Sequence, residues 1–347
     1  MFGKGSAGRR RRSLMDISFI IPAYNASKTI VACLDSIYAL PLSSIEYEVI
    51  VIDDCSSDDT PYKLQQYQKS RSNMKVIFQA ENHRQGAARN CGVKAAKGEY
   101  IVFVDSDDMS EAGIVDAYRT AGSNKAEMVA IHFHCEGKDG LLSEKEPLSF
   151  KADEVFSGRD LQKRHPYWNS GPCAYLYSKE FLQKVNYPFA EDVLYEDSDF
   201  VYVHLYHAQR MCYSKECGYR VRYNTNSTVH TLSYKHLADY FLLGTRMINF
   251  YNTIKNEDQR YADMVLEGGQ YNMAKSLKRL YKLSSGEEIR LCFDRIDDRC
   301  RRYRYFQYTT YDYLWTRWTK TALRHRHFAI ITATIASFAF KICKSLS

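Results

Sequence analysis

Three carboxylates follow one apolar stretch of the chain, and they are the residues best suited to chemistry. The stretch Tyr100–Val104 is followed within four positions by Asp105, Asp107 and Asp108. Like charges in one small loop raise one another's pKa or require a cation. Because hard divalent ions prefer oxygen ligands and keep positions open for phosphates, one interpretation is a Mg²⁺ or Mn²⁺ site.

The apolar stretch itself predicts a strand that is buried on both faces. Tyr100–Val104 is short, β-branched and aromatic, and it contains no charged residue. In open α/β sheets ligands lie outside the carboxyl ends of the strands, where the three carboxylates would emerge. The other interpretation is an acidic turn, in which Asp108 or Ser110 caps a helix that begins near Glu111. The residues alone leave both interpretations open.

Strands and helices alternate around this stretch between residues 16 and 135. The expected strands cover residues 17–21, where Pro22 ends the first, and then residues 48–52, 75–78 and 98–104, with helices between them. Such alternation predicts a parallel sheet with right-handed crossovers. Residues 15–135 therefore have the outline of the nucleotide-binding half of an α/β domain.

Four motifs in this half are familiar in their order and spacing. They are IIPAYN at 20–25, VIDDCSSDDT at 51–60, ENHRQGAARNCG at 81–92 and FVDSDD at 103–108. Together they resemble glycosyltransferase family two, in its inverting, bacterial surface-polysaccharide form. The resemblance covers roughly residues 15–230 and implies a GT-A fold, which is a Rossmann-like α/β fold with a mostly parallel sheet. A C-terminal helical region would follow it.

The resemblance implies a UDP-sugar donor and assigns its nucleotide to the first three motifs. Pro22 and Tyr24 would lie against the uracil and ribose, since an aromatic face offers stacking worth about 1–3 kcal/mol per base. Asp54 would accept the uracil N3 proton, and Arg89 would lie near the base or the diphosphate. For Tyr24, an ordinary loop aromatic is the alternative.

The same resemblance makes Asp105 and Asp107 the metal-binding pair of the family. Asp107 would be the direct ligand of Mn²⁺ or Mg²⁺, and Asp105 would contact the ribose and support the ion through water. Such an ion acts as a Lewis acid on the diphosphate. Arg222 would reach the diphosphate and His230 would complete the metal shell. A solvated arginine and a surface histidine are the alternatives for these two.

A second acidic cluster, YEDSDF at 195–200, resembles the acidic pair of the family at a helix start. The resemblance makes Asp197 the general base that takes the acceptor hydroxyl proton, and Glu196 would position the acceptor or the base. Asp199 is expected to face solvent. The alternative is the general preference for acids at a helix N-terminus.

Residues 136–232 form the expected acceptor half. Residues 165–184 predict a Gly-Pro turn, a strand and a helix. Trp168 and Tyr175 are candidates for a sugar-stacking platform, with core packing as the alternative. The acceptor itself would be a hydroxyl of a glycan or a lipid-linked molecule.

The two ends of the chain carry its positive charge. Residues 1–14 hold five Lys or Arg, and residues 317–347 hold six, with no acid in either. Subtracting these eleven from the net charge of +7 leaves −4 on residues 15–316. A nucleic-acid partner is not expected, because it needs positive charge on a folded face. Basic ends fit an anionic membrane surface better.

The C-terminal third predicts a helical region at 233–316, with helices near 234–255, 258–283 and 287–304. Residues 328–340 would form an apolar helix about 20 Å long, which is shorter than a hydrocarbon core of about 30 Å. A membrane-surface helix within 317–347 is therefore expected, with docking on the protein core as the alternative.

The N-terminus shows no signal peptide, so a cytoplasmic body, peripheral at the inner face of the cell membrane, is expected. Met15 is a plausible true start, which would make residues 1–14 a disordered extension. The ten cysteines include no CxxC pair and are interpreted as reduced thiols.

These features favour an inverting, metal-dependent hexosyl- or N-acetylhexosaminyl-transferase of surface polysaccharide biosynthesis. Two hypotheses from other classes remain beside it. One is a sugar-nucleotide-binding pseudoenzyme or scaffold of an assembly complex, and the other is a soluble transferase that acts on protein. Pocket shape, rather than motif, fixes the sugar and the acceptor.

Overall fold

The computed structural model of the chain describes residues 15–144, 147–151, 154–166, 168, 171–224, 233–279 and 286–303. The chain divides into two compact units. The sheet unit comprises residues 1–189 and 207–223, and the helical unit comprises residues 190–206 and 224–347. The expected extension 1–14, His230 and the expected membrane-surface helix lie outside the described residues.

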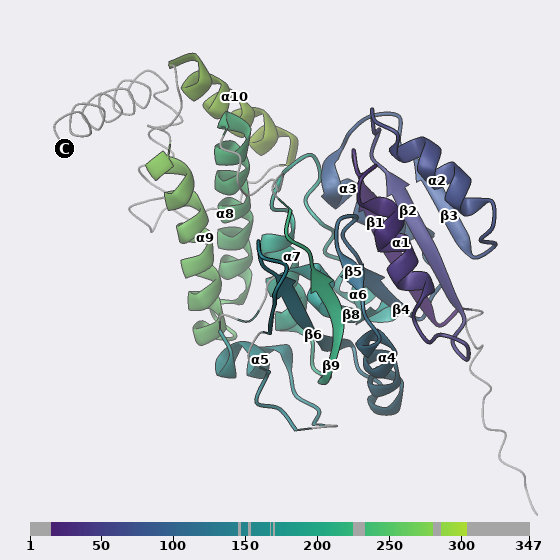
Figure 1. The fold of residues 1–347 in the computed structure, drawn as a ribbon. Coiled ribbons are helices and arrows are strands. Elements are labelled where there is room, and N and C mark those ends of the chain that lie inside the picture. The colour runs from purple at the N-terminus through teal and green to yellow at the C-terminus, as the bar shows by residue number, and fades with distance from the viewer. Residues whose placement is uncertain are drawn as a thin grey trace, which may run out of the picture. The chain divides into compact units, whose positions relative to one another are not determined.

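A single sheet forms the centre of the sheet unit (Figure 1). Among the described residues it has nine strands in the order β3-β2-β1-β4-β8-β6-β9-β5, with β7 paired to β6. Their bounds are β1 (Ile17–Ala23), β2 (Tyr47–Asp53), β3 (Met74–Phe78), β4 (Tyr100–Phe103), β5 (Met109–Ser110), β6 (Met128–Glu136), β7 (Leu142–Glu144), β8 (Tyr175–Ser178) and β9 (Met211–Val221). The strands β1 to β4 are parallel, whereas β8 is antiparallel to β4 and β6. The expected parallel arrangement of these first four strands is confirmed.

Strand β1 continues through Pro22, where the sequence suggested that it ends. Pro22 pairs in register with Ile52 of β2. The carbonyl of Ile20 accepts the N–H of Val104, so this side of β1 faces β4. The backbone nitrogen of Pro22 lies on the same side of β1, beyond Phe103, where β4 ends. A residue without an N–H is tolerated there because no ladder hydrogen bond is lost.

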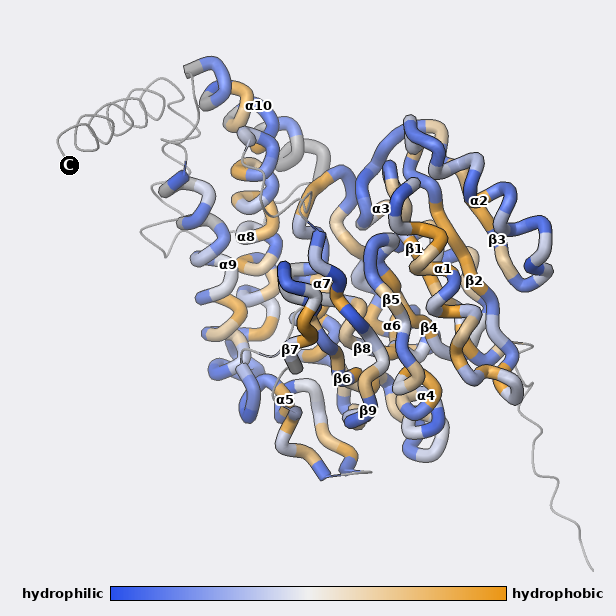
Figure 2. Tube along the Cα trace, viewed as in Figure 1, coloured by the Kyte–Doolittle hydropathy of each residue, from blue (hydrophilic) through white to orange (hydrophobic). Residues whose placement is uncertain are grey.

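The strands near the centre of the sheet are the most deeply buried. Every residue of β1 and β4 is buried, and Figure 2 shows hydrophobic residues along β1 and β2. Burying one such aliphatic side chain contributes about 1.5–3 kcal/mol. The carboxyl ends of these strands therefore give the following loops a rigid base.

Six helices of the sheet unit lie among the described residues. They are α1 (Ile30–Tyr38), α2 (Thr60–Gln68), α3 (Arg84–Ala95), α4 (Gly113–Asn124), α5 (Gly158–Arg164) and α6 (Lys179–Val185). Helix α3 packs closely on β1 and β2. A Cβ atom at Gly92 would lie 2.3 Å from Cγ2 of Ile20, so this approach requires glycine.

The helical unit contains α7 (Asp197–His207), whose last residue belongs to the sheet unit, α8 (Tyr234–Ile254), α9 (Gln259–Arg279) and α10 (Gly286–Tyr303). Helix α8 packs on both α9 and α10 (Figure 1). The three helices expected after residue 233 are thus confirmed. None of the helices in the described part of the chain is both long and apolar enough to cross a bilayer.

Candidate functional site

The loops after β1 and β2 hold each other in place. Asn25, which has a left-handed backbone (φ 49°), donates its N–H to Oγ of Ser56 at 2.9 Å. Its side-chain oxygen accepts the Ser57 N–H at 2.8 Å. The preceding Tyr24 is 47% exposed. The ring of Tyr24 is therefore presented outward on an ordered loop, whereas Pro22 is buried within β1.

Asp58 ties the same two loops together from the other side. Its carboxylate accepts the backbone N–H groups of Ser27 and Thr60 at 3.1 and 2.9 Å. Burial raises the pKa of Asp58, but the hydrogen bonds from Ser27 and Thr60 outweigh burial and lower it to about 2. An ionised Asp58 therefore stabilises the loops.

Asp54 is buried directly after β2, and it is hydrogen-bonded to the end of β1 and to the segment before α3. It is 2% exposed, and its Oδ1 accepts the His83 N–H at 2.8 Å. Its own N–H donates to the carbonyl of Ala23 at 2.8 Å. Burial raises the pKa of Asp54, against the lowering effect of the backbone hydrogen bonds from His83 and Arg84. The contact between Asp54 and uracil stays a prediction.

The three aspartates after β4 lie in one tight turn. The N–H of Asp108 donates to the carbonyl of Asp105 at 3.0 Å. Asp105 and Asp107 are half-buried and Asp108 is buried. The capping interpretation is wrong, because α4 begins at Gly113 without a side-chain cap and Ser110 belongs to β5.

Strand β9 supplies the partners of Asp108. The hydroxyl of Tyr219 donates to Oδ2 of Asp108 at 2.6 Å and accepts the Asp105 N–H at 3.2 Å. The backbone N–H of Arg222 donates to Oδ1 of Asp108 at 2.8 Å. Burial, followed by the charges of Asp105 and Asp107, raises the pKa of Asp108 to about 8. The sequence does not predict Tyr219 as a site residue, because Tyr219 lies 111 residues after Asp108 in the chain.

Arg89 is the charged partner of Asp105. Its Nη2 lies 2.7 Å from Oδ1 of Asp105, and its side chain is 2% exposed. The guanidinium lies 5.4 Å from the ring centroid of Phe189, which Asn90 holds through two backbone hydrogen bonds. Arg89 is therefore packed into the structure beneath the turn, and its contact with a nucleotide stays a prediction.

The aspartate turn fits a hard divalent cation. Its donors are carboxylate oxygens, and the pKa of Asp108 is raised first by burial and then by the neighbouring charges of Asp105 and Asp107. Asp107 and Asp105 would hold the ion. A second group, Glu111, His134 and Cys217, has possible ligand atoms within 4.8 Å of one another, in the part of the chain that the structure describes. There, however, Arg220 forms an ion pair with Glu111.

The two aromatic residues proposed as an acceptor platform are part of the core. Trp168 is 9% exposed and contacts Phe133 and Tyr213 edge-on, with ring centroids 5.7 and 6.1 Å apart. Tyr175 is 0% exposed. Neither ring offers a face to a sugar, because aromatic neighbours and the sheet cover it. The core-packing alternative is the one observed.

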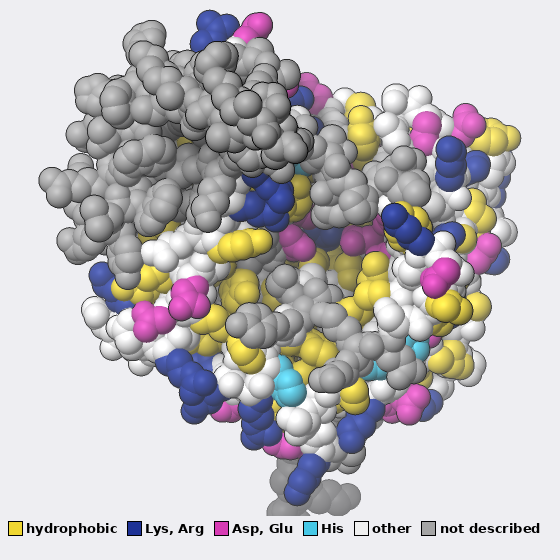
Figure 3. All heavy atoms as spheres, turned by 60° about the vertical axis from the view of Figure 1, so that its left-hand side comes forward, with side chains coloured by type: hydrophobic (Ala, Val, Ile, Leu, Met, Phe, Trp, Pro, Cys, Tyr) yellow, Lys and Arg dark blue, Asp and Glu magenta, His cyan; other side chains and the backbone are white. Residues whose placement is uncertain are grey.

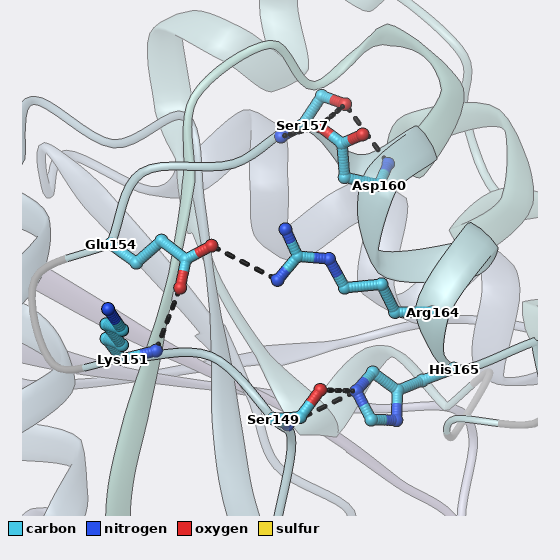
Figure 4. Close-up of polar contacts among 7 residues, drawn as sticks. All are labelled: Ser149, Lys151, Glu154, Ser157, Asp160, Arg164 and His165. Carbon is cyan, nitrogen blue, oxygen red and sulfur yellow. Dashed lines mark hydrogen bonds and ion pairs between the residues drawn. The ribbon is translucent and has the colours of Figure 1, made fainter.

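The segment before Trp168 is held by polar contacts around α5 (Figure 4). Ser157 caps α5, Arg164 lies 3.1 Å from Glu154, and Nε2 of His165 accepts the Ser149 N–H at 3.2 Å. Burial, with a contribution from Arg164, lowers the pKa of His165. This network orders the polar stretch that leads into and out of α5.

The second acidic cluster begins α7 in the helical unit. Glu196 is 4% exposed, and Asp197 is half-buried at the first position of the helix. The expectation that Asp199 faces solvent is wrong: it is 1% exposed and forms an ion pair with Arg246 of α8. A buried carboxylate requires such a partner.

Figure 3 shows Asp and Glu side chains beside Lys and Arg side chains near the centre of the view, with hydrophobic side chains around them. This face carries mixed charge rather than one sign. Arg222, expected at a diphosphate, has a half-buried side chain, and its reach to a ligand stays a prediction.

Comparison with known proteins gives a family match for the first half of the chain. Residues 18–185 match the family model described as glycosyl transferase family 2. The uncharacterized glycosyltransferase EpsJ of Bacillus subtilis (strain 168) is 32% identical over 238 residues, which cover 65% of this chain and 66% of EpsJ. A poly(ribitol-phosphate) beta-glucosyltransferase of Bacillus spizizenii is 46% identical over 95 residues, or 27% of this chain and 15% of that protein.

Solved structures share the fold. The crystal structure of S. aureus TarS 1–349 in complex with UDP-GlcNAc aligns with a TM-score of 0.63 at 22% identity, over 82% of this chain and 80% of that one. The match extends past the sheet unit into the helices that follow it in sequence. The expected α/β GT-A fold with a C-terminal helical region is confirmed.

Proposed function

Because this chain belongs to glycosyl transferase family 2, we propose that it is an inverting, divalent-cation-dependent glycosyltransferase. The donor is a UDP-sugar, and the acceptor is a hydroxyl of a glycan or a lipid-linked molecule. The proposed setting is the assembly of a surface polysaccharide. Contact with a membrane surface belongs to this proposal through residues 1–14 and 317–347, which lie outside the described part.

The aspartate turn after β4 is the observation that carries the proposal. Three carboxylates lie within four positions, and the buried Arg89 pairs with Asp105. Burial, followed by the charges of Asp105 and Asp107, raises the pKa of Asp108 to about 8. A cluster of carboxylates at the carboxyl end of a central strand favours a cation and, with it, a diphosphate. Asp107 and Asp105 would hold the ion.

A UDP donor fits the loops after β1 and β2. The exposed ring of Tyr24 stands on a loop that Asn25 and Asp58 keep ordered, so a base can stack without ordering the loop first. The related fold of TarS was solved with UDP-GlcNAc, which supports the same nucleotide here. A divalent ion at the aspartate turn would neutralise the charge that develops on the diphosphate as the sugar leaves.

Proton transfer is assigned to the start of α7. Asp197 would take the proton from the acceptor hydroxyl as that oxygen attacks the anomeric carbon, and Glu196 would orient the acceptor or the base. Asp197 is half-buried at the first turn of a helix, where the helix dipole favours its ionised form. An ionised carboxylate is the state that a general base needs.

The experiment that tests the proposal is a thermal-shift screen of the full chain. UDP, GDP, CDP and a panel of UDP-sugars are each added with Mn²⁺ and with a chelator. We expect UDP and one UDP-sugar to raise the melting temperature only when Mn²⁺ is present. Equal responses to all three nucleoside diphosphates, or no response to any, would contradict the proposal.

A further inference from the structure

We propose that Asp239 and Arg295 are positioning residues for the acidic pair Glu196 and Asp197. They form an ion pair between α8 and α10, in which Asp239 is buried and Arg295 is half-buried, and this pair fixes the loop leading into α7. The inference rests on the proposed function, in which Asp197 takes the acceptor proton. All the contacts that carry it lie within the helical unit.

The loop in question has a backbone that its own sequence does not favour. Between residues 192 and 197, Asp192 and Tyr195 both adopt left-handed conformations, with φ of 59° and 63°. Aspartate adopts this conformation more readily than most residues, but a bulky residue such as Tyr195 keeps it only where the surroundings over-determine it. External contacts must therefore hold this loop in place.

Asp239 provides the first of these contacts. It lies in α8 and is 0% exposed, and its Oδ2 accepts the N–H of Leu194 at 3.1 Å. Leu194 is two residues before Glu196. The hydrogen bond from a backbone N–H to a buried carboxylate is charge-assisted and is stronger than one between neutral groups. The middle of the loop is thus fixed to α8.

Arg295 provides the second contact to the loop and also neutralises the charge of Asp239. Its Nε and Nη2 donate to the two carboxylate oxygens of Asp239 at 2.8 and 3.1 Å. Nη2 also donates to the carbonyl of Asp192 at 2.8 Å. One guanidinium therefore joins α10, α8 and the start of the loop. A bidentate pair fixes direction as well as distance.

A stacked ring completes the arrangement. Tyr195 lies against Tyr240, with ring centroids 4.0 Å apart and planes 14° from parallel. Lys275 of α9 lies 4.1 Å from the centroid of Tyr240 and donates to its hydroxyl at 2.8 Å. Three helices thus contribute to holding one short loop. Packing of the helices against one another does not need contacts to the backbone of this loop. The contacts therefore serve to hold the loop that carries Glu196 and Asp197.

The expected consequence is kinetic. A base displaced by about 1 Å can lower the rate about 10²-fold, because reacting atoms must meet at a fixed distance. Donor binding is assigned to the sheet unit and should not depend on this loop. Loss of the ion pair should therefore lower kcat and leave the donor KM and the affinity for UDP unchanged.

The test compares Arg295→Ala and Arg295→Lys with the control Arg290→Ala, an exposed arginine on the same helix. We expect kcat to fall about 10–100-fold in Arg295→Ala and to recover in part in Arg295→Lys, which keeps the charge. Arg290→Ala should equal wild type. Each variant is assayed below its own melting temperature, and UDP affinity is measured by calorimetry.

Because Arg295→Ala removes the ion-pair partner of the buried Asp239, that variant can fail to fold. Arg295→Lys and the double variant Asp239→Asn/Arg295→Gln, which removes both charges, then decide the question. Folded variants with wild-type kcat would overturn the inference, and so would a raised donor KM with unchanged kcat.

A combined variant separates this inference from the proposed function. If Arg295 acts through Asp197, adding Arg295→Lys to Asp197→Asn should cause no further loss of the residual rate. A full additional loss would overturn the positioning role. A wild-type chain that neither binds UDP nor transfers sugar would instead contradict the proposed function.

Discussion

Carboxylates in the two units of this protein differ in how closely they crowd one another and in how many of them have an arginine partner. In the sheet unit, Asp105, Asp107 and Asp108 share one tight turn with Arg89, and the pKa of Asp108 rises to about 8. In the helical unit, Asp199 pairs with Arg246, and Asp239 pairs with Arg295.

The difference separates a ligand site from a scaffold. Crowded carboxylates keep negative charge concentrated, which is useful only where a cation is to be bound. Carboxylates that each have their own arginine hold geometry and leave little net charge. By this criterion we propose that the turn after β4 binds an ion, whereas Asp199 and Asp239 hold α7 and the loop before it in position.

The largest effect is expected from Asp197→Asn. The variant should bind UDP as the wild type does, because its nucleotide contacts are unchanged. Transfer should fall by roughly 10²–10⁴-fold, because the amide cannot accept the acceptor proton. A matched control is Glu191→Gln, which removes one negative charge from the same segment. Wild-type transfer by Asp197→Asn would show that Asp197 is not the general base.

An intermediate effect is expected from Tyr219→Phe. Loss of the hydroxyl leaves the buried Asp108 oxygen and the Asp105 N–H without a hydrogen bond that they now make. The free energy of unfolding should fall by about 1–3 kcal/mol, and UDP affinity in Mn²⁺ should weaken by about tenfold if about 1.4 kcal/mol of that loss reaches the site.

The control for Tyr219→Phe is Tyr213→Phe on the same strand. The Tyr213 hydroxyl lies 3.0 Å from Nδ1 of His132, away from the aspartate turn. Its loss should lower stability without changing UDP affinity. Equal effects of the two variants on UDP binding would show that Tyr219 has no special link to the turn.

The smallest effect is expected from Asp58→Asn. The pKa of Asp58 is lowered to about 2 in the folded state, below the value of about 3.9 in an unfolded chain. Its ionised form therefore stabilises the fold above pH 4, and this contribution is lost as pH falls through 2. The substitution should cost about 1 kcal/mol at pH 7 and progressively less below pH 4. Denaturant titrations at several pH values, with Asp59→Asn as the exposed control, measure this; a constant difference would contradict the loop role.

The sequence predicts most of the sheet unit because its signals are local. Buried strands such as Tyr100–Phe103 are continuous apolar runs, and Asp105, Asp107 and Asp108 follow one of them directly. The parallel order then follows from alternation with helices. The helix boundaries after residue 233 were likewise accurate to within a few residues, since hydrophobic periodicity is a local property.

The remaining features depend on residues that meet only in the fold. Tyr219 reaches Asp108 across 111 residues, and Arg295 reaches Asp239 across 56. The local sequence predicts that Asp199 is exposed to solvent, because its partner Arg246 lies on another helix, α8. Tyr175 was considered for a sugar platform because an aromatic residue has the same local signal in a core and in a binding site.

We propose that the turn after β4 binds the donor through a divalent ion. The most direct measurement is a calorimetric titration of UDP into the wild-type chain and into Asp107→Ala, each with Mn²⁺ and with chelator. Glu99→Ala, an exposed acid at the opposite end of β4, is the control. We predict that Mn²⁺ strengthens UDP binding in the wild type and in the control and has no effect in Asp107→Ala. The same Mn²⁺-dependent affinity in Asp107→Ala would contradict the claim.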